Sequence, residues 1–262
     1  MSPDPGGPAR TEASAVDLWT LPERLVPEFV DRAGGPAAVL DPQERARHAR
    51  KRSSGGRRRF LGGRLLCRLA LSARTGLPPT AWRFAATRHG RPELDPGHHG
   101  LRFNVSHTEG LIACVVAREH ACGVDVESVP FDDDKARLLS ARFDDAQRAA
   151  LAGAPDPVAA LEELWVLTEA YLKGVGTGLA NGVGALRFTR RPGGTGLVVT
   201  DGRRPGAGRR WHLDLVRPGP GHLLAVAVDD GGAGGLRRHD LVDAGSFPRG
   251  AWPAAPPAAV SL

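Results

Sequence analysis

Two acidic side chains lie two residues apart in the segment Gly123-Val124-Asp125-Val126-Glu127. The alternation of apolar and acidic residues predicts a β-strand in which Asp125 and Glu127 share one face and the valines face the core. Two adjacent carboxylates repel each other unless a cation lies between them. Mg²⁺ suits such hard oxygen ligands and completes its shell with water and phosphate oxygens. The alternative is the solvated face of an ordinary edge strand.

A third acidic residue lies on a predicted helix that starts at Asp156-Pro157, runs to about Lys173 and stops at Gly174. Glu169 and Lys173 are four residues apart and therefore share one face of this helix. A solvated surface Glu–Lys pair is the alternative. However, only three of the 35 Lys and Arg residues are lysines, at positions 51, 135 and 173. A lysine is needed only where a compact or deprotonable cation is required, because arginine keeps its proton.

The elements that must position these residues are expected to form two α+β halves. Asp41-Pro42 begins a helix-like run to about Arg52, and apolar spacing predicts a helix from Arg57 to Arg74. Further elements are expected as strands at 82–85, 101–105, 110–117 and 123–129, a helix at 136–151, and four strands between 186 and 228. We therefore expect a disordered lead (1–16), an N-terminal half (17–120), a C-terminal half (121–241) and a Pro/Ala-rich tail (242–262).

Composition restricts the compartment and the partners. The chain has 262 residues, a formal net charge of +6 and a sequence pI of about 10, so anionic partners are favoured. Arg45–Arg59 suggests nucleic-acid binding as an alternative, but this segment lacks interleaved aromatics and a recognised motif, and we expect no such partner. Three cysteines without CxxC spacing indicate free thiols in a reducing compartment. With no membrane-spanning stretch and no signal peptide expected, we predict a cytoplasmic protein.

Five short segments, taken in order, resemble the phosphopantetheinyl transferase superfamily of the surfactin-synthetase-activating type. They are Arg59-Phe60, Gly90-Arg91-Pro92, Phe103 to His107, Gly123 to Glu127, and Trp165 to Lys173 followed by Gly174 to Leu179. The resemblance runs from about residue 40 to residue 230. It implies two similar α+β halves in a pseudo-twofold arrangement with the active site between them.

The resemblance also implies the reaction. The donor would be coenzyme A, the acceptor a serine of an acyl- or peptidyl-carrier protein, and the by-product adenosine 3′,5′-bisphosphate. Asp125, Glu127 and Glu169 match the family's Mg²⁺ ligands, and His107 would lie near the 3′-phosphate. The positions that match coenzyme A contacts are Arg47, Arg50, Arg59, Arg91, Ser106, His107 and Lys173.

Three points stay open at this stage. The general base is Lys173, a metal-activated water or Glu127, with Glu169 completing the catalytic group. Val129 and Phe131 either contact the carrier protein or cap the core, and we expect a monomer. The family usually has a lysine directly before the helix glutamate, where this chain has Thr168.

This departure raises the alternative of a coenzyme A-binding relative with lost or altered transferase activity. A metal-dependent phosphohydrolase is a further alternative. It would explain the carboxylates, but neither the turn at His107 nor Lys173.

Overall fold

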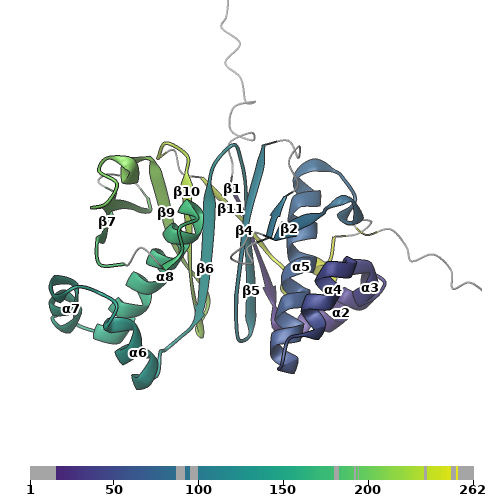
Figure 1. Cartoon of the computed structure of the whole chain (residues 1–262), viewed down its shortest axis with the longest axis horizontal. Helices are drawn as coiled ribbons and strands as arrows, with labels where there is room; N and C mark the ends of the chain where they lie inside the picture. Colours follow the sequence, from purple (N-terminus) through teal and green to yellow (C-terminus); the bar gives the residue numbers. More distant parts are fainter. Residues whose placement is uncertain are drawn as a thin grey trace, which may run out of the picture.

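The computed structural model describes residues 16–86, 92–94, 100–179, 183–191, 193, 195–232, 235–248 and 252. Two sheets lie back to back in the middle of the molecule, and helices cover their outer faces (Figure 1). Each half therefore contributes one sheet and its helices, and the predicted α+β fold of two similar halves is confirmed.

The N-terminal half is built on a four-stranded sheet in the order β11-β1-β5-β4. Its strands are β1 (Val16–Pro22), β4 (Leu101–Thr108), β5 (Leu111–Arg118) and β11 (Leu236–Asp240), with a small hairpin of β2 (Phe84–Ala86) and β3 (Pro92–Leu94). Its helices are α2 (Val26–Arg32), α3 (Pro36–Val39), α4 (Pro42–Ala49) and α5 (Ser54–Thr75), with 3₁₀ turns at Glu23–Leu25 and Pro79–Ala81. The buried leucines of α5 pack on the outer face of this sheet.

The C-terminal half is built on a five-stranded antiparallel sheet in the order β6-β10-β9-β8-β7. Its strands are β6 (Cys122–Ser128), β7 (Leu186–Arg190), β8 (Leu197–Asp201), β9 (Trp211–Gly219) and β10 (His222–Asp229). Its helices are α6 (Asp133–Ser140), α7 (Asp145–Ala152) and α8 (Pro157–Val175). Two short 3₁₀ turns, Ala207–Arg210 in this half and Ala244–Ser246 after β11, complete the described elements.

The two sheets share one apolar layer. Leu18 of β1 and Val115 of β5 face Val124 of β6 and Val226 of β10, and all four side chains are essentially inaccessible. Because alternate residues of a strand point to opposite faces, burying Val124 and Val126 in this layer turns Asp125 and Glu127 toward α8. The predicted orientation of the carboxylate strand is therefore confirmed.

Two glycines let α8 lie close against β6. A Cβ atom at Gly123 would lie 2.1 Å from the carbonyl oxygen of Ala170, and one at Gly174 would lie 2.6 Å from the Trp211 ring. Both distances are far shorter than real contacts allow, so a side chain at position 123 would push α8 away from β6, and one at position 174 would push it away from Trp211 of β9. This close approach places Glu169 and Lys173 above the acidic strand.

The helical elements differ from prediction in two places. The helix expected at 136–151 is two helices, because Asp144 starts α7 by accepting a hydrogen bond from the Gln147 N–H (2.8 Å). Helix α8 continues past Gly174 to Val175 and ends at Gly176, whose positive φ of 80° suits a left-handed cap. Gly174 is a helical residue whose lack of a side chain allows close packing against Trp211, and it does not end the helix.

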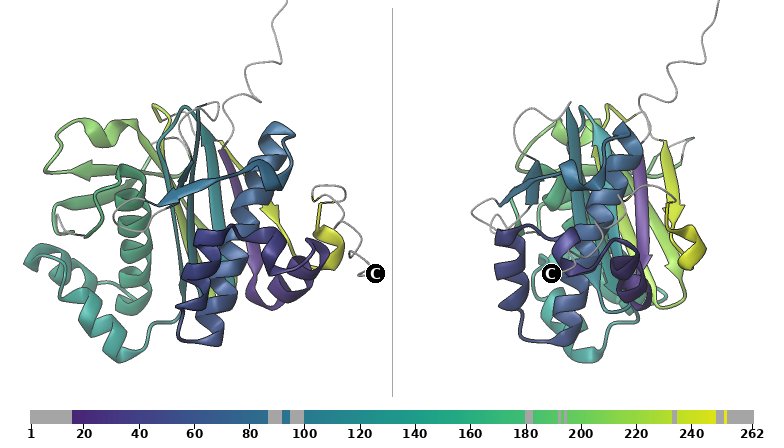
Figure 2. Two further views of the ribbon diagram at one scale, coloured as in Figure 1. Left: turned by 45° about the vertical axis from the view of Figure 1, so that its right-hand side comes forward. Right: turned by 90° about the vertical axis from the view of Figure 1, so that its right-hand side faces the viewer.

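The two ends of the described chain differ more from the sequence-based expectation. β1 was not predicted as a strand, and it begins at Val16, inside the range expected to be disordered. β11 pairs in parallel with β1 and so belongs to the N-terminal sheet, although it falls in the range expected for the C-terminal half (Figure 2). Phe247 and Trp252, from the expected tail, are buried in the N-terminal core. Among the described helices, none is long and apolar enough to cross a membrane.

Candidate active site

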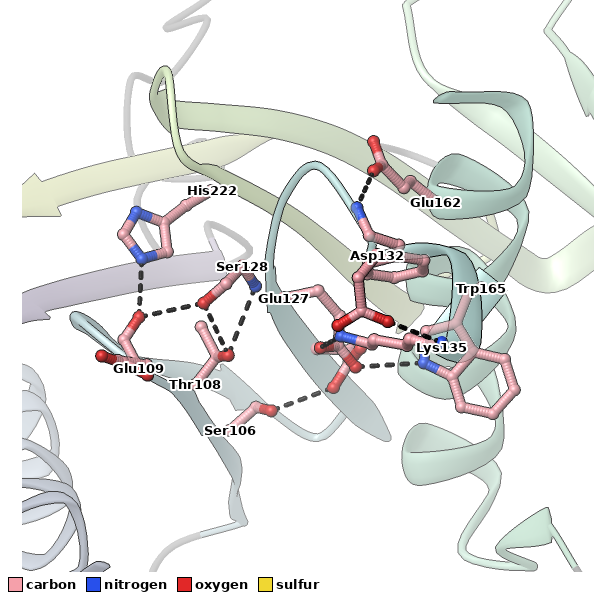
Figure 3. Close-up of polar contacts among 12 residues, drawn as sticks. Ser106, Thr108, Glu109, Glu127, Ser128, Asp132, Lys135, Glu162, Trp165 and His222 are labelled. Atoms are coloured by element: carbon pink, nitrogen blue, oxygen red, sulfur yellow. Dashed lines mark hydrogen bonds and ion pairs between the residues drawn. The ribbon is translucent and has the colours of Figure 1, made fainter. Parts of the chain in front are cut away.

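The site forms where an edge strand of each sheet meets the other. The Asn104 side chain on β4 accepts a hydrogen bond from the Val124 N–H of β6 (3.0 Å), and the hydroxyls of Thr108 and Ser128 lie 2.9 Å apart. These side-chain contacts join β4 and β6, which belong to different sheets. Figure 3 shows the resulting row of polar groups, which runs from Glu109 and Ser128 to Glu127 and Trp165.

Ser106, Asp125 and Lys173 form a triangle at this junction. The Ser106 hydroxyl donates to Asp125 Oδ1 (3.0 Å), and Lys173 Nζ donates to the same oxygen (2.5 Å) and to Ser106 Oγ (3.1 Å). Asp125 is 3% exposed, and its other oxygen, Oδ2, is buried without a hydrogen-bond partner among the described residues. A buried carboxylate oxygen without a donor is costly, so this atom marks where a further positive group belongs.

Glu127 is held by two donors from different helices. Lys135 Nζ of α6 lies 2.9 Å from Oε2, and Trp165 Nε1 of α8 donates to Oε1 at 3.0 Å. Figure 3 shows both donors converging on this carboxylate. The Lys135 ammonium also lies 3.9 Å from the centre of the Phe131 ring, a cation–π contact.

Glu169 is the third acidic group. Burial raises the pKa of Glu169, and the nearby negative charges of Asp125 and Glu127 raise it further, against the opposing effect of Lys173 and Arg142. Asp125 and Glu127 on β6 and Glu169 on α8 therefore act on one another electrostatically. Crowded carboxylates of this kind are common where an enzyme binds a cation.

We tested whether these residues fit Mg²⁺. In the described ranges, no three His, Cys, Asp or Glu side chains stand in metal-binding geometry, and lysines pair with Asp125 and Glu127. The donor chemistry nevertheless suits Mg²⁺, since Asp125 and Glu127 are near enough to act electrostatically on Glu169, and Asp125 Oδ2 has no donor among the described residues. Glu127 and Glu169 are only partly buried, which leaves room for their side chains to reorient.

The basic side of the site surrounds His107 at the end of β4. Desolvation lowers the pKa of His107 although its side chain still reaches solvent, and the positive charges of Arg59, Lys173 and Lys51 lower it further. Arg59 is positioned by an ion pair with Glu23 (3.0 Å). Of these cations, Lys173 pairs with Asp125, while Arg59 and Lys51 form no ion pair with the acidic strand in the described part of the chain, an arrangement suited to phosphate oxygens.

Glu23 itself is buried. Burial alone would raise its pKa, but hydrogen bonds from the Gly110 N–H, Arg58 and Arg59 bring that pKa below the ordinary value. Glu23 therefore stays ionised and holds the start of α5 against the β4–β5 turn.

The remaining predicted residues lie as follows. Arg47 is half-buried on α4 and Arg50 is exposed directly after it, so their contact with a donor stays a prediction. Arg91 lies outside the described residues. Phe131 is 5% exposed and packs in the C-terminal core, so for this side chain the structure favours the core-capping alternative. Val129 is half-buried at the edge of the same core, and its contact with a carrier protein stays a prediction.

Thr168 is fully buried, and its hydroxyl has no partner in the described part of the chain. The residue therefore lies inside the protein and presents no side-chain group to solvent. Its replacement of the family lysine removes a charge without placing a new polar group at the site.

Sequence reasoning gave no site role to three residues that contact the acidic strand. Asn104 joins the two sheets, Trp165 donates a hydrogen bond to Glu127, and Lys135 forms an ion pair with Glu127. The scarcity of lysine was a signal for Lys135, because it singled out all three lysines. No comparable signal marked the other two, whose partners lie 20 and 38 residues away.

Comparisons with known proteins identify the family of this chain. The 4′-phosphopantetheinyl transferase superfamily profile matches residues 121–227, and the profile of a 4′-phosphopantetheinyl transferase N-terminal domain matches residues 35–120. The 4′-phosphopantetheinyl transferase HetI of Nostoc sp. is 31% identical over 169 residues, which cover 63% of this chain and 70% of that protein.

Two further relatives carry similar names. A phosphopantetheinyl transferase of Thraustochytrium sp. is 27% identical over 259 residues, covering 91% of this chain and 84% of the relative. The 4′-phosphopantetheinyl transferase gsp of Aneurinibacillus migulanus is 28% identical over 131 residues, covering 46% and 49%. On the matched profiles and these relatives, the chain belongs to the 4′-phosphopantetheinyl transferase superfamily, as an enzyme of the two-domain, surfactin-synthetase-activating type.

Proposed function

We propose that this enzyme transfers the 4′-phosphopantetheine group of coenzyme A to a serine of an apo acyl- or peptidyl-carrier protein, with Mg²⁺, and releases adenosine 3′,5′-bisphosphate. The observation that carries the proposal is the acidic group of Asp125, Glu127 and Glu169 beside the cations around His107. A pyrophosphate donor needs both, since one group holds a divalent cation and the other binds phosphate oxygens directly.

The reaction exchanges one phosphorus–oxygen bond for another. The carrier serine oxygen forms a bond to the pantetheine-side phosphorus, and the bond from that phosphorus to the bridging oxygen breaks. The bridging oxygen leaves with adenosine 3′,5′-bisphosphate. Such transfers depend mainly on positioning and electrostatic stabilisation of the phosphoryl oxygens.

Asp125, Glu127 and Glu169 are the residues that would hold Mg²⁺. When bound, this cation supplies positive charge to the pyrophosphate oxygens. Arg59, Lys51 and His107 would bind and orient the phosphates, since their positions converge at the end of β4. Arg59 enters this role pre-oriented, because its pairing with Glu23 limits the conformations it can adopt.

The serine proton needs an acceptor. Lys173 is ion-paired with Asp125, so its ammonium suits charge stabilisation better than proton removal. Glu169 would itself be a cation ligand, and a cation at this carboxylate opposes the effect of the burial and acidic neighbours that raise its pKa, so a water molecule at the site is the better-suited acceptor. Glu127, held by Lys135 and Trp165, is better placed as a ligand.

The test is a mass measurement. The purified enzyme is mixed with coenzyme A, Mg²⁺ and an apo carrier protein, and the intact mass of the carrier is recorded. We expect the gain of one phosphopantetheine group, and no gain when EDTA is present. Coenzyme A binding without a mass gain on acyl- and peptidyl-carriers would instead support the relative with lost or altered activity.

A further inference from the structure

All three lysines of this chain gather around one site. Lys173 pairs with Asp125, and Lys135 pairs with Glu127. Lys51 lies near enough to His107 to act on it electrostatically. The other described side-chain salt bridges to carboxylates use arginine or histidine, as in the pair of Arg68 with Glu44. The use of lysine at the acidic strand indicates a property that arginine lacks, namely a compact charge on a flexible stem that does not bind a carboxylate in a bidentate way.

The ammonium of Lys135 is held from several sides. Helix α6 begins at its cap Asp132, whose Oδ1 accepts the Lys135 backbone N–H (2.8 Å). The side chain then places Nζ 2.9 Å from Glu127 Oε2 and 3.9 Å from the Phe131 ring centre. Phe131 is fixed in turn, because its N–H donates to Glu162 Oε1 at 2.7 Å. The ammonium therefore occupies a built position beside the acidic strand.

The Lys135 ammonium in this position opposes the binding of a divalent cation to Glu127. Both oxygens of Glu127 already accept hydrogen bonds, one from Lys135 and one from Trp165. A divalent cation that approaches Glu127 meets a positive charge at the same oxygen, and like charges this close repel strongly outside bulk water. Lys135 is 34% exposed and has a flexible stem, so it can leave toward solvent. A forked, bidentate guanidinium would be harder to displace.

We propose that Lys135 is a displaceable counter-ion of Glu127. It positions this carboxylate in the cation-free enzyme and leaves when a divalent cation binds to Asp125, Glu127 and Glu169. The inference rests on the proposed function, because it takes these three carboxylates as the cation ligands. It deepens that function by making cation binding an exchange of one positive group for another.

The first experiment uses the scarcity of lysine. The full-length wild-type protein is treated briefly with acetic anhydride, with and without Mg²⁺ alone, and acetylation is read at each lysine by peptide mass spectrometry. We expect Mg²⁺ to accelerate acetylation of Lys135 severalfold, since its ammonium is released. Lys51, which is paired with no acidic ligand in the described contacts, is the internal reference. Unchanged or slower labelling of Lys135 overturns the proposal.

The second experiment measures affinity for Mn²⁺ alone by paramagnetic resonance of the free ion. Lys135→Met should bind Mn²⁺ roughly three- to tenfold more tightly than wild type, because a competing ion pair and a like charge are both removed. Arg137→Met is the matched control, since it removes one charge from the same helix in an exposed pair with Asp134. We expect that control to stay within about twofold of wild type.

The Mn²⁺ affinities distinguish a failure of the counter-ion role of Lys135 from a failure of the proposed metal ligands. Equal or weaker Mn²⁺ binding by Lys135→Met, or no binding by either protein, overturns the counter-ion role. If Asp125→Asn binds Mn²⁺ as wild type does, the proposed metal ligands are wrong whatever Lys135 does. If Lys135→Met fails to fold, Lys135→Gln replaces it, and the labelling experiment needs no variant.

Discussion

Two groups of buried carboxylates and cations lie in this molecule, and they are built differently. In the N-terminal half, Glu44 is 1% exposed and is paired by Arg64 and Arg68, each at 2.8 Å. Its Oε2 also accepts the Asp41 N–H at 3.1 Å. Between the halves, Asp125 is equally buried, but lysine holds one of its oxygens and the other has no donor in the described region.

The difference distinguishes the Glu44 group, which stabilises the fold, from the Asp125 group at the junction, which we propose to be functional. Every carboxylate oxygen around Glu44 has a donor, and the ring of Phe60 covers the Arg64 guanidinium (5.0 Å) while that of Phe84 covers Arg68 (4.7 Å). Nothing further can bind there without breaking a pair. The junction instead keeps an acceptor, Asp125 Oδ2, that has no donor among the described residues, so a further positive group could bind there. Burial and charge alone do not identify a site, and what sets the junction apart from the Glu44 group is a buried carboxylate oxygen without a donor in the part of the chain that the structure describes.

The largest effect is expected at the junction. Asp125→Ala and Glu169→Ala should each reduce transfer by at least about 10³-fold, because each removes a ligand of the cation that stabilises the pyrophosphate. Circular dichroism should show an intact fold, and intact-mass assays of the carrier give the rate. Asp134→Ala, an exposed carboxylate on α6, is the control. Near-normal rates in either ligand variant would remove the metal assignment.

A substitution in the Glu44 group should lower stability and leave activity unchanged, the opposite of the result expected at the junction. Glu44→Gln leaves two buried arginines without their anion and should lower the free energy of unfolding by about 3–5 kcal/mol. Activity per folded molecule should stay unchanged. Urea denaturation measures the loss, with Glu28→Gln as control, since that exposed pair with Arg32 is worth less than about 1 kcal/mol. A loss of turnover without a loss of stability would contradict the comparison.

Lys173 tests what the junction lysine supplies. Lys173→Met should slow transfer by about 10²-fold, because a charge near the phosphates and Asp125 disappears. Lys173→Arg should retain more activity than Lys173→Met if the ammonium acts through charge. Equal loss in both variants would instead favour the lysine as general base, since arginine cannot release its proton. Arg217→Met, at an exposed pair with Glu163, controls for loss of a surface charge.

The ionised Glu169 carboxylate should lower the free energy of unfolding of the cation-free enzyme. Its pKa is raised above the ordinary 4.5, chiefly by burial, so the folded state holds this proton more tightly than the unfolded state. Stability therefore falls as the pH rises from about 4.5 through the folded-state pKa and then levels off. Glu169→Gln should be more stable than wild type at neutral pH without divalent cations, and this advantage should vanish below that window. Thermal unfolding between pH 4 and pH 8 checks the trend.

The smallest effect is expected at Thr168. Thr168→Val should raise the free energy of unfolding by about 0.5 kcal/mol, because a buried hydroxyl without a partner is removed. Transfer should not change. Thr75→Val is the matched control and should be neutral or destabilising, since the Thr75 hydroxyl donates to the Leu71 carbonyl (3.0 Å). A drop in activity for Thr168→Val would show that this position does act on the site.

The local patterns of the sequence determined a large part of this picture. Alternation in the segment 123–127 predicted which residues of β6 face the core, and the four-residue spacing placed Glu169 and Lys173 on one face of α8. The caps Asp41 and Asp156 marked two helix starts correctly. These features follow from strand and helix periodicity, which a single segment carries by itself.

Only the tertiary structure decided the rest. The strand β11 completes the N-terminal sheet by pairing with β1, about 220 residues earlier, and no local pattern encodes that partner. Trp165 of α8 and Lys135 of α6 meet at Glu127 although they lie 38 and 8 residues from it in the sequence, and Asp125 Oδ2 is buried without a donor among the described residues. Sequence periodicity determines which face a residue occupies. Which groups share that face, and which of them stay unpaired, depends on the long-range packing of the two halves.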